Sequence, residues 1–136
     1  MSDKSDLVNN WIIKADHDLG TAKITYLHIP EYLDTVTFHC QQAVEKYLKS
    51  YLIYLEIDFK FTHDSVYLLD LITTNDKAFS EFYERVSELE SYAVEVRYPN
   101  ETIFLSKEKV ESAIRTAEAV RATVTEKTGS DANSLP

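Results

Sequence analysis

The chain has 136 residues and a net charge of −9, from 23 acidic and 14 basic side chains. That length suits one domain with a sizeable core, and the acidic balance argues against general binding to nucleic acids, which requires a basic surface. Two glycines and three prolines are too few for an all-β chain with many tight turns.

The single cysteine, Cys40, excludes an internal disulfide and is typical of a reducing compartment. The first residues are polar and do not resemble a signal peptide. No apolar stretch is long enough to span a bilayer. We therefore expect a cytoplasmic location and no association with membranes.

Apolar residues at three- and four-residue spacing predict the first helix over residues 7–27, with residues 1–6 frayed. The side chains expected to face the core are Leu7, Trp11, Ala15, Leu19, Ala22 and Tyr26. Trp11 is the only tryptophan, and its place in this series predicts a buried core residue.

The central helix is predicted over residues 32–55, because the stretch from Phe38 to Leu55 has no glycine or proline and its apolar residues form one broad face. Its polar residues fall largely on the other side: Gln42, Glu45, Lys46 and Lys49. These side chains form either a solvated face or a groove that binds a ligand or a partner.

Capping residues predict where the next helices begin. The segment 62–64, Thr-His-Asp, precedes a short helix over residues 65–73, and Asp76 precedes a longer helix over 77–96. His63 in the first of these segments either orients the loop or binds an anion at the helix N-terminus.

Pro99 ends the helix predicted over residues 77–96, and Ser106 caps a last helix that runs to about residue 126. Residues 127–136 lose all periodicity and are expected to be a disordered tail. The sequence thus predicts an all-α fold within residues 1–126, an up-and-down antiparallel bundle of four long helices plus one short helix.

No signature of a known catalytic or metal site is present, so we expect neither a metal nor a cofactor. Arg97, Tyr98 and Pro99 form the other notable segment. Arg97 stands near a helix C-terminus, where a guanidinium group either satisfies the last carbonyls or binds an anion.

Four stretches, read in order, carry a further pattern. They are Trp11-x3-Ala15-x2-Asp18-Leu19-x2-Ala22, then Phe38-x2-Gln41-Gln42-Ala43-Val44-Glu45-Lys46-x-Leu48-Lys49, then Thr62-His63-Asp64-x3-Leu68-Leu69, and last Arg97-Tyr98-Pro99. In this order and spacing they resemble the HEPN family (higher eukaryotes and prokaryotes nucleotide-binding). The resemblance implies a helical bundle, a homodimer, nucleotide binding, and often a nucleotidyltransferase partner in a toxin–antitoxin pair.

Active members of that family are metal-independent RNases with an Arg-x(4–6)-His motif. With Arg97 as the motif arginine, a histidine is needed at one of three positions that hold Thr102, Ile103 and Phe104. All four histidines also precede the first arginine, Arg85. The usual RNase site is therefore absent, which favours a protein that is not an enzyme.

The leading hypothesis is a HEPN-like nucleotide- or partner-binding module that acts with a minimal nucleotidyltransferase. Its expected ligand-binding residues are Arg97, Tyr98, Lys46, Lys49 and His63. The first alternative is a metal-independent RNase toxin with a degenerate motif. The second is a purely structural bundle that only dimerises.

Overall fold

The structure is a computed structural model that describes residues 2–95 and 105–130. Helices follow one another along these residues, and no β-strand occurs among them. They are α1 (Ser2–His28), α2 (Leu33–Tyr54), α3 (Ser65–Thr73), the 3-10 helix η1 (Lys77–Phe82), α4 (Tyr83–Glu95) and α5 (Lys107–Thr128). None of the described helices is long and apolar enough to cross a membrane.

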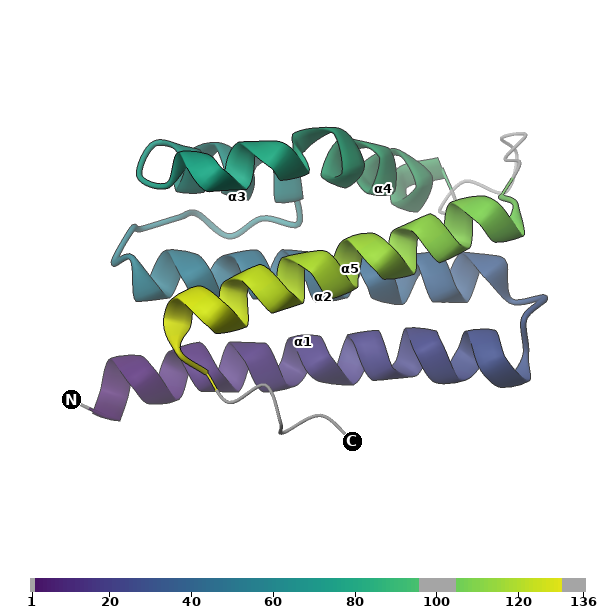
Figure 1. The fold of residues 1–136 in the computed structure, drawn as a ribbon, viewed down its shortest axis with the longest axis horizontal. Coiled ribbons are helices and arrows are strands. Elements are labelled where there is room, and N and C mark those ends of the chain that lie inside the picture. The colour runs from purple at the N-terminus through teal and green to yellow at the C-terminus, as the bar shows by residue number, and fades with distance from the viewer. Residues whose placement is uncertain (1, 96–104, 131–136) are drawn as a thin grey trace.

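The long helices pack lengthwise into an up-and-down bundle, which confirms the predicted all-α fold (Figure 1). α1 and α2 run in opposite directions, and so do α4 and α5. α2 contacts α1, α3, α4 and α5. It is therefore the central helix, as predicted, and its most buried side chains include Cys40, Val44, Tyr47, Leu48 and Leu52.

The starts of α3, η1 and α5 follow their predicted capping residues. The Asp64 carboxylate accepts hydrogen bonds from the first-turn amides of α3, and Ser106 Oγ accepts one from the Lys109 amide of α5 at 3.1 Å. Asp76 likewise caps η1. The predicted helix over 77–96 begins instead as a 3-10 helix, whose three-residue turn places the buried Phe79 and Phe82 on one face.

α1 differs from its prediction in two ways. It begins at Ser2, so the expected fraying of residues 2–6 is wrong, and Lys4 of its first turns pairs with Glu56 at 3.2 Å. Leu7 is 47 % exposed, and Trp11 is only partly buried and lies outside the core. The residues of α1 that enter the core are Val8, Ile12, Ala15, Leu19 and Ala22.

The helical period explains this error. A residue advances about 100° around an α-helix, so a strict four-residue step drifts by about 40° each time. The series that starts at Leu7 and Trp11 takes such steps, and it therefore enters the core only from Ala15 onward. The series that starts at Val8 takes steps of both four and three residues, and it stays on the buried side throughout.

Candidate functional site

Three polar residues of α2, each four positions from the next, lie inside the protein. Gln41, Glu45 and Lys49, which we call the α2 polar stripe, are 1 %, 2 % and 4 % exposed. A solvated face is therefore excluded for Glu45 and Lys49. Charges this deeply buried require partners, because removing an ion from water is costly.

The Glu45 carboxylate is held from two sides. Lys49 Nζ donates to Glu45 Oε2 at 2.9 Å, and His63 Nδ1 lies 3.1 Å and 3.3 Å from the two carboxylate oxygens. Since an ionised carboxylate only accepts hydrogen bonds, Nδ1 carries the proton and Nε2 is the remaining ring nitrogen. The His63 side chain is 55 % exposed, so this imidazole joins the buried pair to the surface.

Gln41 extends the network to α4. Its Nε2 donates to Glu90 Oε1 at 3.0 Å and to the His63 carbonyl oxygen at 3.3 Å. Glu90 Oε1 also accepts from the Ser65 amide at 3.1 Å. These bonds fix the start of α3, and with it the loop that carries His63, against the central helix.

Two aromatic rings flank the buried ammonium. Lys49 Nζ lies 5.5 Å from the centre of the Trp11 ring and 5.7 Å from that of Phe61, within the range of cation–π attraction. Phe61 also meets the His63 ring edge to face, at 5.3 Å between centroids. The Phe61 side chain is 87 % exposed, so aromatic surface faces solvent directly beside the network.

Lys46 belongs to a different cluster, on Asp18 of α1. Its Nζ donates to Asp18 Oδ2 at 2.5 Å, and His39 Nδ1 contacts Asp18 Oδ1 at 2.9 Å. The structure therefore brings together Lys49 and His63 among the predicted site residues, but not Lys46. Arg97 and Tyr98 lie outside the described residues.

A third charged cluster was not anticipated from the sequence. Asp16 Oδ1 accepts from the Tyr47 hydroxyl at 2.5 Å and from Arg121 Nε at 2.8 Å, which joins α1, α2 and α5. Burial, with the Asp16 hydrogen bond, raises the pKa of Tyr47. Burial disfavours the charged Arg121, but Asp16 outweighs it and raises the Arg121 pKa. No local pattern marks Asp16, because its partners come from distant segments.

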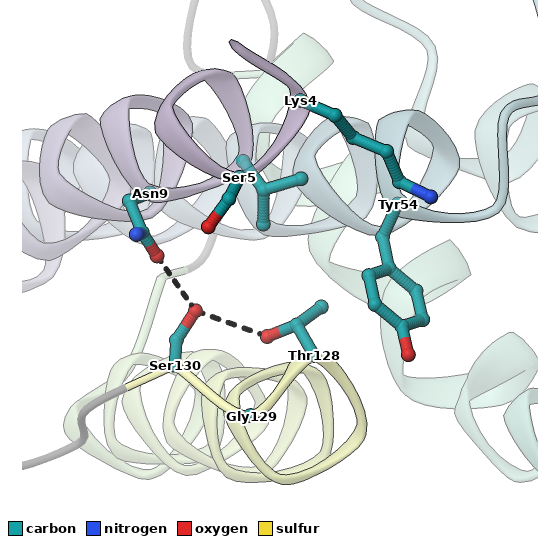
Figure 2. Close-up of a pocket in the computed structure, with 8 residues that line it drawn as sticks. Lys4, Ser5, Asn9, Tyr54, Thr128, Gly129 and Ser130 are labelled. Carbon is teal, nitrogen blue, oxygen red and sulfur yellow. Dashed lines mark hydrogen bonds between the residues drawn. The ribbon is translucent and has the colours of Figure 1, made fainter. Parts of the chain in front are cut away.

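A pocket of about 330 Å³ opens between the start of α1 and the ends of α2 and α5 (Figure 2). Ser130 Oγ donates there to Asn9 Oδ1 at 2.9 Å and accepts a hydrogen bond from Thr128 Oγ1 at 3.1 Å. Its cation, Lys4, is already paired with Glu56. None of Lys46, Lys49 and His63 lines this pocket. Within the described residues, no group of three or more metal-ligating side chains could hold a metal ion.

The fold and the network define a class, that of small up-and-down helical bundles with a charged network along the central helix. The family model of the HEPN domain matches residues 8–127. The crystal structure of an archaeal HEPN homologue is similar, with a TM-score of 0.71, 24 % identity, and coverage of 89 % of this chain and 97 % of that one. A comparison of the sequence with curated proteins found no match. The chain therefore belongs to the HEPN family.

Proposed function

We propose that this HEPN domain is a non-enzymatic module that binds a nucleotide at the outer end of the Glu45 network. The observation that carries the proposal is the half-exposed His63, oriented by a carboxylate that Lys49 also holds. Buried ion pairs are often no better for stability than apolar side chains. A network of this kind that ends on an exposed imidazole is therefore better explained by the positioning of a ligand-binding group.

The ligand chemistry follows from these groups. His63 offers Nε2 to a hydrogen-bonding group, and its protonated form adds a positive charge that suits a phosphate. The proposed site also includes Arg97 and Tyr98, as the family resemblance implies. Lys46, which directly follows Glu45 in α2, adds a second cation if it exchanges Asp18 for the ligand.

Family membership also supports the wider proposal of a homodimer with a nucleotidyltransferase partner, in a toxin–antitoxin-type pair. Many HEPN proteins are encoded beside such an enzyme. Light scattering on the purified chain tests the dimer, and co-expression with a neighbouring nucleotidyltransferase tests the partner. A monomer, or no such neighbour and no complex, would contradict this part.

Calorimetric titration with nucleoside triphosphates tests the binding site. Arg97→Ala should abolish binding without loss of helicity, and His63→Ala should weaken it about tenfold or more, as expected for one hydrogen bond to a charged group. His28→Ala, an exposed histidine of α1, is the matched control. Unchanged affinity in both site variants would overturn the proposed site, whereas absence of any nucleotide binding would favour the purely structural bundle.

One observation favours a second function, that of a metal-independent RNase. A histidine whose Nδ1 contacts a carboxylate is arranged as a general base, with Nε2 open to take a proton from a hydroxyl. RNA cleavage in the presence of chelator, lost in His63→Ala, would establish this function in place of simple binding. The missing motif histidine and the net charge of −9 argue against it.

A further inference from the structure

Trp11 and Phe61 are aromatic residues that the core does not use. Trp11 is the only tryptophan of the chain, yet it is partly exposed and outside the core, and the Phe61 side chain is 87 % exposed. A single exposed apolar residue needs no explanation. Two such rings, from distant segments and beside the same buried ammonium, form a local feature that does.

We propose that Trp11 and Phe61 form a stacking subsite for the base of a bound nucleotide. The inference rests on the proposed nucleotide binding and adds to it the position of the base. Aromatic side chains bind bases of any identity by stacking, because every base has a π face. The subsite therefore accepts nucleotides in general rather than one base.

The geometry of Lys49 supports this use of the rings. Its ammonium lies within 6 Å of both ring centres and is fixed by Glu45 at 2.9 Å. Cation–π attraction therefore holds the two rings in place from the buried side. Phe61 remains open to solvent, and its edge-to-face contact places His63 next to it. A base on these rings thus has its phosphates close to the exposed imidazole.

The surface beside Trp11 provides room for a base. A hollow of about 280 Å³ is lined by Trp11 with Leu7, Asn10 and Lys14 of the same helix. Leu7 adds apolar surface, and the Asn10 amide can both donate to and accept from the edge of a base. Lys14 is exposed to solvent, so its charge can reach a phosphate.

Trp11 supplies its own optical probe, because no other tryptophan emits. We would titrate the full chain with each common ribonucleoside triphosphate, with adenosine, and with inorganic tripolyphosphate, using free N-acetyltryptophanamide to correct for absorbance. Nucleotides and adenosine should quench or shift the Trp11 emission. Tripolyphosphate, which has no base, should leave it unchanged even where it binds.

Variants then separate the base from the phosphates. Phe61→Ala and Trp11→Leu should each raise the Kd for the nucleotide roughly 5- to 100-fold, the loss expected for one stacked base, without changing the Kd for tripolyphosphate. Tyr32→Ala, an aromatic residue 50 % exposed elsewhere on the surface, is the control. Calorimetric binding with no change in Trp11 emission and wild-type Kd in both variants would overturn the subsite alone. Absence of any nucleotide binding would overturn the proposed function and this inference together.

Discussion

Replacing Lys49 with methionine tests whether the ion pair inside the bundle holds the fold together. The two side chains of the pair, Lys49 and Glu45, are 5 % and 3 % exposed, so water cannot replace the lost ammonium. Methionine keeps an unbranched apolar stem of similar length, so apolar packing against the neighbouring rings is largely retained while the cation–π attraction to Trp11 and Phe61 is lost. The substitution therefore removes the charge with little loss of packing.

The expected loss of unfolding free energy is about 3 kcal/mol. Removing one partner of a buried ion pair typically costs about 3–5 kcal/mol, because the other charge is left uncompensated. The lower end applies here, since His63 still contacts the Glu45 carboxylate and leaves it with one hydrogen-bond partner. For a domain of this size, such a loss lowers the melting temperature by about 10 °C.

Urea unfolding followed by circular dichroism measures this loss. Lys23→Met is the matched control, because the Lys23–Glu118 pair has a similar distance of 2.9 Å but side chains that are 52 % and 43 % exposed. It should cost less than about 1 kcal/mol. Equal losses in the two variants would refute the reasoning. Adding Glu45→Gln to Lys49→Met should restore part of the stability, and failure to do so would assign the loss to packing.

Three other predictions concern the two glycines and the pKa values of Asp76 and Cys40. Gly20→Ala should raise the unfolding free energy by about 0.5–1 kcal/mol, because a Cβ there meets nothing within 4 Å. Gly129→Ala should lower the unfolding free energy by about 1 kcal/mol, because the φ angle of Gly129 is +74°. Urea unfolding in which both substitutions change the stability in the same direction would contradict this. The hydrogen bond from Tyr51 lowers the pKa of Asp76 despite burial, so the folded chain takes up this proton less readily than the unfolded chain. Stability therefore falls as the pH falls through the carboxyl range, and Asp76→Asn should make that fall shallower in unfolding curves. Burial raises the pKa of the Cys40 thiol to about 12, and the nearby Glu118 raises it by a smaller amount. A thiol reagent in mild alkali should therefore label Cys40 only after the protein unfolds. Rapid labelling of the folded protein would contradict the burial of this side chain.

The helices could be predicted because their signals are local. Asp64 and Ser106 cap helices from within a few residues, and the apolar face of the central helix repeats over many turns. Its predicted range of 32–55 agrees with α2, and 65–73 with α3. Such features depend on spacing along the chain, which the sequence contains in full.

The candidate site depends on contacts between distant segments and could be predicted only in part. Lys49 and His63 were singled out, but nothing local shows that they share Glu45, because that requires the loop before α3 to fold back onto α2. The burial of Glu45 is equally non-local, since its position four residues before Lys49 suits a surface ion pair just as well.

Of the Asp16 cluster and the Glu45 network, only the Glu45 network calls for a functional explanation. In the Asp16 cluster the side chains of Arg121 and Asp16 are only 12 % and 7 % exposed. Tyr47 and Arg121 tie three helices together through Asp16, so the fold alone accounts for this cluster. The Glu45 network also secures a loop, but Gln41, Glu90 and the Ser65 amide already do so through α4. What stability does not require is that the same carboxylate hold His63 half-exposed. That difference, rather than the presence of buried charge, is the reason we propose a ligand at His63.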